Sequence, residues 1–114
     1  MTIQVTSLIG KTAVSRESGL KLKSAIDDLL SQGNIVEIDF EGIQFYASPF
    51  FNTVIAPYLG KMSLGEMKER FIFHNLTPVG RNLLNQVIHN AIDFYSKSEE
   101  EQKRIEDSVN NGLD

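Results

Sequence analysis

The feature that most constrains the fold of this chain is a threefold alternation of strand-like and helix-like segments. The strand-like segments are residues 2–8, 35–40 and 70–75, and each is followed by helical spacing, over about 15–32, 49–60 and 77–95. This order predicts a small α/β domain in which the helices pack on a mostly parallel or mixed sheet of three to four strands. The crossovers between parallel strands are expected to be right-handed.

Local signals refine this outline. The run at 35–40 is apolar enough to predict a central strand covered on both faces, whereas 2–8 is expected toward an edge. One further short strand is expected at 10–14 or 43–46. Pro57 cannot donate to the carbonyl of Thr53, so the second helix is expected to kink or end there.

Charge divides the chain into a body and a tail. With 114 residues it fits one domain, which we place at residues 1–96. Residues 97–114 carry six acidic and three basic side chains, hence −3 of the net charge of −4. So few apolar residues cannot offset the entropy of ordering the tail, and we predict a frayed helix or disorder unless a partner docks it.

Composition narrows the functional classes. The chain has no apolar run near the roughly 20 residues of a membrane helix. It also lacks cysteine and a signal-peptide pattern, so a cytoplasmic protein without a membrane partner is expected. No basic stripe suits a phosphate backbone, and nucleic acid is not expected as a partner.

The sequence offers little that supports catalysis. No glycine fingerprint for a dinucleotide or a P-loop is present, and His74 and His89 lie fifteen residues apart with nothing local to pair them. We therefore predict no catalytic residue, no metal site and no cofactor. Asp39 ends the central strand, where open α/β sheets place ligands, so it is a ligand-binding candidate. As an aspartate beside the Glu41-Gly42 turn, it is more simply interpreted as an acceptor of backbone N–H groups.

The segment "FYASPFF" holds the most informative polar residue, Ser48. A serine directly before proline often begins a helix, because its hydroxyl caps backbone N–H groups and proline suits the first helical turn. The same position, just past a strand, would also stabilise a phosphate on Ser48. We favour the N-cap interpretation, and a phosphoacceptor role for Ser48 is the alternative.

The stretches "IVEIDFEGIQFYASPFFNTVIAPYL" and "RFIFHNLTPVGRNLLNQVI" resemble the STAS-like domains, relatives of anti-sigma-factor antagonists. The helix segment "SRESGLKLKSAIDDLLSQG" fits the same group, so the resemblance covers about residues 10–95. In the phospho-regulated antagonists, a motif of Asp-Ser-Ser/Thr-Gly type carries the serine that a histidine-kinase-like ATPase phosphorylates. Here the matching positions are Ala47, Ser48, Pro49 and Phe50, so only the serine is kept.

The resemblance implies a non-catalytic module for protein interaction and regulation. Its partner would be a signalling protein such as a histidine-kinase-like ATPase, docked around Tyr46, Ser48, Phe50 and Phe51. The alternative is a nucleotide- or small-ligand-binding domain at the strand ends near Asp39. A homodimerisation domain is the third hypothesis.

Overall fold

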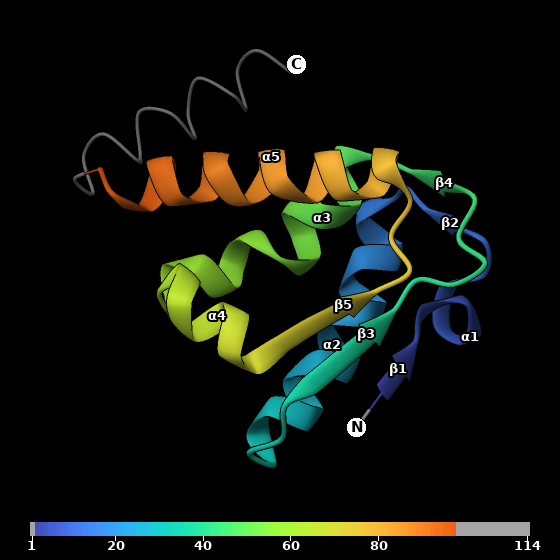
Figure 1. The fold of residues 1–114 in the computed structure, drawn as a ribbon, viewed down its shortest axis with the longest axis horizontal. Helices are drawn as coiled ribbons and strands as arrows, with labels where there is room; N and C mark the ends of the chain where they lie inside the picture. The colour runs from blue at the N-terminus through green and yellow to red at the C-terminus, as the bar shows by residue number, and fades with distance from the viewer. Residues whose placement is uncertain (1, 98–114) are drawn as a thin grey trace.

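The computed structural model describes residues 2–97 (Figure 1). In chain order the elements are β1 Thr2–Gln4, α1 Val5–Ile9, β2 Thr12–Ala13, α2 Arg16–Ser31, β3 Val36–Asp39, β4 Phe45–Tyr46, α3 Ser48–Val54, the 3-10 helix η1 Ala56–Gly60, α4 Leu64–Arg70, β5 Phe71–His74 and α5 Pro78–Tyr95. This α/β architecture with parallel strands confirms the predicted fold class. The predicted tail, apart from Lys97, lies outside the described residues. Within the described part of the chain, no helix combines the length and apolar character needed to cross a membrane.

The main sheet has three strands in the order β1-β3-β5, all parallel. Ile38 on β3 is in register with Ile3 and with Phe73, so the predicted central strand does lie in the centre. Strand β1 is at an edge, as expected, but it ends at Gln4 because the chain turns at once into α1. Val5 at the start of α1 is completely buried, and the helix ends at Gly10, whose φ is positive at 79°.

Only one face of the main sheet is covered by the described residues, which corrects the expectation of two covered faces. The burial of β3 alternates: Val36 and Ile38 are fully buried, and Glu37 and Asp39 are half-buried. A strand with this alternation packs one face on a core and presents the other to solvent. The core behind the sheet is continuous with the buried residues of α2, α3 and α5.

The two short segments, of which one was expected to extend the sheet, instead pair with each other. Strands β2 and β4 form a separate parallel ladder, with Ala13 in register with Tyr46. Each of these strands leads into a helix, β2 into α2 and β4 into α3. An added Cβ at Gly19 on α2 would lie 2.9 Å from the Phe50 carbonyl oxygen on α3, so the two helices cross in close backbone contact. Only glycine permits this approach.

The helices expected over about 15–32 and 77–95 are confirmed as α2 and α5. Ser15, Ser63 and Thr77 cap α2, α4 and α5, each accepting a hydrogen bond from a backbone N–H three residues on. The second helix ends early, as Pro57 predicts: α3 stops at Val54 and the chain continues as η1.

Candidate functional site

Ser48 does not cap α3, and this corrects the favoured interpretation of the sequence. The N-cap is Ala47, whose carbonyl accepts the Phe50 N–H at 3.2 Å, while Ser48 is the first residue of the helix. The physical reason is the β2–β4 ladder: the Ala47 N–H donates to the Ala13 carbonyl at 3.0 Å and holds Ala47 extended. The half-buried Ser48 side chain forms no hydrogen bond with any residue in the described range.

Two predicted partner-binding residues belong to the core instead. Phe50 and Phe51 are fully buried, so neither ring can contact a partner in this structure. Their rings pack edge to face with centroids 5.3 Å apart, and each also packs against Phe40. The apolar helix face that suggested an interface is the face that fills the core.

Tyr46 holds an intermediate position. Its ring stacks on Phe51 with centroids 5.9 Å apart and lies against Gly80 of α5, where an added Cβ would come within 2.8 Å. Burial raises the pKa of the Tyr46 hydroxyl, and the nearby Thr77 offsets part of that rise. Even so, this buried hydroxyl makes no hydrogen bond of normal geometry within residues 2–97. Tyr46 is therefore mainly a packing residue with one unsatisfied polar atom.

Three exposed apolar residues lie on the elements that pack near the start of α3. Val14 follows β2, Phe45 lies on β4 and is 63% exposed, and Val79 lies in the first turn of α5 and is 62% exposed. The ladder and the packing of Tyr46 on Gly80 bring these elements together at one end of the molecule (Figure 1). We call Val14, Phe45, Ser48 and Val79 the helix-start surface.

A groove between α2 and α3 adjoins this surface. It has a volume of about 540 Å³ and is lined by Arg16, Leu20, Lys23, Pro49, Asn52, Thr53 and Pro57. Pro49 is the residue after Ser48, so the cationic Arg16 shares the groove with the first turn of α3. The second cation, Lys23, is paired with Asp27 at 2.9 Å.

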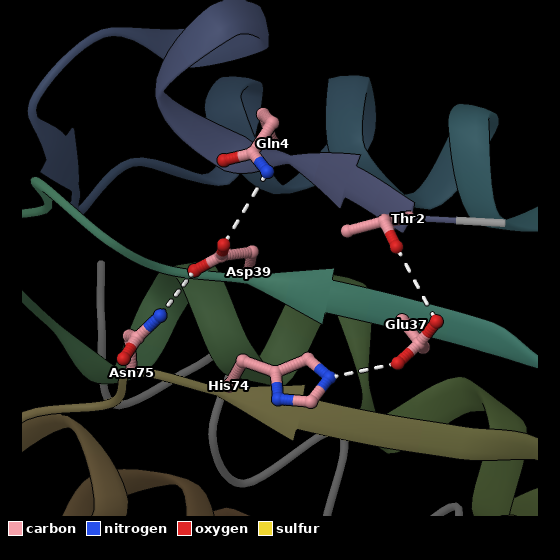
Figure 2. Close-up of polar contacts among 6 residues, drawn as sticks. All are labelled: Thr2, Gln4, Glu37, Asp39, His74 and Asn75. Atoms are coloured by element: carbon pink, nitrogen blue, oxygen red, sulfur yellow. Dashed lines mark hydrogen bonds and ion pairs between the residues drawn. The ribbon is translucent and has the colours of Figure 1, made fainter.

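Asp39 lies on the open face of the main sheet, where its carboxylate is satisfied by protein groups (Figure 2). It accepts the Glu41 N–H at 2.9 Å, the Asn75 side-chain amide at 2.9 Å and the Gln4 amide at 3.3 Å. Chiefly the Asn75 hydrogen bond, followed by that of Glu41, lowers the pKa of Asp39. The backbone-acceptor interpretation is confirmed, and ligand binding by Asp39 stays a prediction.

A second polar contact on the open face was not expected from the sequence. The Glu37 carboxylate lies 3.0 Å from His74 Nε2 and accepts the Thr2 hydroxyl at 3.3 Å (Figure 2). The His74 hydrogen bond is the largest cause of the lowered pKa of Glu37. The signal in the sequence was strict alternation in β3, which places Glu37 and Asp39 on one face. The residues that hydrogen-bond to Glu37 and Asp39 could not be predicted in the same way, because they depend on the register between neighbouring strands. Within the described residues no group of three metal-binding side chains gathers.

Together these observations define a class: a small α/β domain with parallel strands, an exposed helix-start surface and an open polar sheet face. The sequence profile described as "STAS-like domain of unknown function (DUF4325)" matches residues 18–81, more than half of the chain. The chain belongs to this family, as its resemblance to STAS-like domains predicted. No curated protein and no solved structure gives a significant match.

Proposed function

We propose that this domain is a non-catalytic protein-interaction module with a regulatory role, and that it docks a signalling partner through the helix-start surface. The observation that carries the proposal is the exposure of Phe45 on β4 and of Val79 in the first turn of α5, two elements that pack together through Tyr46 and Gly80. Large apolar side chains grouped at the surface are typical of interaction sites, whereas the same residues scattered singly would need no explanation. The resemblance to anti-sigma-factor antagonists is the reason to propose a partner of the histidine-kinase-like ATPase type, since the matched STAS-like family is itself described as of unknown function.

The same proposal makes Ser48 a regulatory phosphoacceptor. Its hydroxyl is half-exposed and is not used for capping, so phosphorylation removes no helix cap. A phosphate there would add a charge of about −1.5 to −2 at the start of α3. Arg16, on the wall of the adjoining groove, is the cation suited to pair with it. The added charge would also disfavour an apolar partner surface.

Affinity capture with matched variants tests the docking surface. Wild-type protein, Phe45→Ser and a control variant, Ile92→Ser, serve as bait, because Ile92 is an exposed residue distant in sequence from the helix-start surface. We expect a protein that wild type and Ile92→Ser retain and that Phe45→Ser loses. If every captured protein binds all three baits equally, the helix-start surface is not the docking site.

Ser48 variants test the regulatory step with the captured partner. Ser48→Ala should leave the melting temperature nearly unchanged, since no cap is lost. Ser48→Asp should stay folded and change partner affinity. Equal affinity of wild type, Ser48→Ala and Ser48→Asp for the partner would exclude regulation through Ser48.

The alternative function, a nucleotide-binding domain, is tested by thermal denaturation with added nucleotides. A rise in melting temperature with nucleotide would favour that alternative.

A further inference from the structure

The open face of the main sheet is a second surface, independent of Ser48. All-parallel sheets occur almost only with both faces covered, yet the described residues leave one face of β1, β3 and β5 without a helix (Figures 1 and 2). Register aligns Thr2, Glu37 and Ile72 in one row across the three strands, and it aligns Gln4, Asp39 and His74 in a second row. These residues form the open face.

The dimensions of this face fit one helix. Three strands place the outer two about 10 Å apart, which equals the diameter of an α-helix with its side chains. The four residues of β3 extend about 13 Å, and two to three helical turns have that length. In layered α/β folds a helix is the element that covers such a sheet.

The charge of the open face selects the kind of helix. The carboxyls of Glu37 and Asp39 are both ionised at neutral pH because the ordinary pKa of such groups is about 4. Hydrogen bonds from His74 to Glu37 and from Asn75 to Asp39 lower the pKa of each further. No lysine or arginine lies on the three strands of this face. Ile72 on β5 is 41% exposed, and this adds an apolar contact beside the acidic pair. The complementary surface has Lys or Arg next to apolar side chains.

Two other occupants fit the charges poorly. Residues 98–114 of this chain carry six acidic and two basic side chains, which the acidic face would repel. A second copy would bring Glu37 and Asp39 against the same acidic pair, and like-charge contact across an interface disfavours that arrangement.

We propose that the open face binds a basic amphipathic helix of a partner protein, with Lys or Arg side chains against Glu37 and Asp39 and apolar side chains against Ile72. The helix supplies the missing layer of the sheet. Part of the binding comes from long-range attraction between the basic side chains and the acidic pair. Salt screens this attraction, so the binding becomes weaker at high ionic strength.

The test uses NMR of the full ¹⁵N-labelled chain with two synthetic helical peptides. One peptide carries Leu on one face flanked by Lys, and in the other every Lys is replaced by Glu. We expect the Lys peptide to shift the backbone amides of β1, β3 and β5, and the Glu peptide to leave them unchanged. Added salt should weaken the binding of the Lys peptide.

Matched variants give the test its specificity. Glu37→Gln with Asp39→Asn keeps side-chain shape and should weaken binding of the Lys peptide about tenfold, the order expected for losing two charge contacts. Asp28→Asn with Glu66→Gln removes two exposed carboxylates of α2 and α4 and should leave affinity unchanged.

Equal weakening by both pairs of variants would overturn the proposal, because it would indicate general charge attraction. The absence of saturable shifts in β1, β3 and β5 at millimolar peptide would also overturn it. A dimer that buries the same amides would assign the face to a second copy. None of these outcomes depends on the helix-start surface.

Discussion

The unsatisfied hydroxyl of Tyr46 gives a prediction of sign as well as size. A buried polar group without a hydrogen bond costs about 1–3 kcal/mol. Tyr46→Phe removes only that hydroxyl and keeps the ring stacked on Phe51. We therefore expect the free energy of unfolding to rise by about 1 kcal/mol, which raises the melting temperature of a domain of this size by about 4–8 °C.

Tyr58 provides the matched control, because the same substitution there should have the opposite effect. The Tyr58 hydroxyl donates to the Asp27 carboxylate and so fixes η1 to α2. Burial is the largest cause of the raised pKa of Tyr58, and the Asp27 hydrogen bond raises it further. Tyr58→Phe loses a hydrogen bond to a charged group, so the free energy of unfolding should fall by about 1–2 kcal/mol.

Thermal and urea denaturation of the three proteins measure both effects. The Tyr46 prediction is wrong if Tyr46→Phe melts below wild type, since that result would mean that the hydroxyl is bound, by Thr77 or by water.

Three further predictions concern the body, the tail and the open face. Gly19→Ala should lower stability by about 1–3 kcal/mol, because an added Cβ has no room against α3. Gly65→Ala should be neutral or stabilising, because its Cβ would lie 3.8 Å from Ser63 Oγ, an ordinary contact; urea denaturation of the two variants measures both effects. Deleting residues 100–114 should lower the melting temperature by less than about 5 °C, and a larger drop would mean that the tail packs on the body. The lowered pKa values of Glu37 and Asp39 mean that the folded state binds fewer protons than the unfolded state, so their stabilising contribution is present above about pH 4 and is lost as the pH falls further. In an acid titration, Glu37→Gln with Asp39→Asn should therefore show a smaller loss of stability than wild type, and an identical pH profile would contradict the assignment.

The sequence by itself determined the three longer helical segments and the strands that precede them, although it did not predict helix α1 within the strand expected over residues 2–8. Apolar spacing, capping residues and Pro57 act within a few residues along the chain, so the helices that begin after Ser15 and Thr77 and the early end of α3 were predicted from local chemistry. The family could also be predicted from the sequence, because the resemblance rests on the pattern of apolar residues that form the core.

Only the tertiary structure decided which of these residues are buried, which are exposed and which contact one another. Ser48 lost its capping role because Ala47 pairs with β2, a contact between segments over 30 residues apart. Phe50 and Phe51 are buried by helices packing around them, and an apolar helix face is the same in sequence whether it meets a core or a partner. The Glu37–His74 contact spans 37 residues and needs the parallel register of β3 with β5. Strand direction, register and which face is covered arise from contacts distant in sequence, and local patterns carry no record of them.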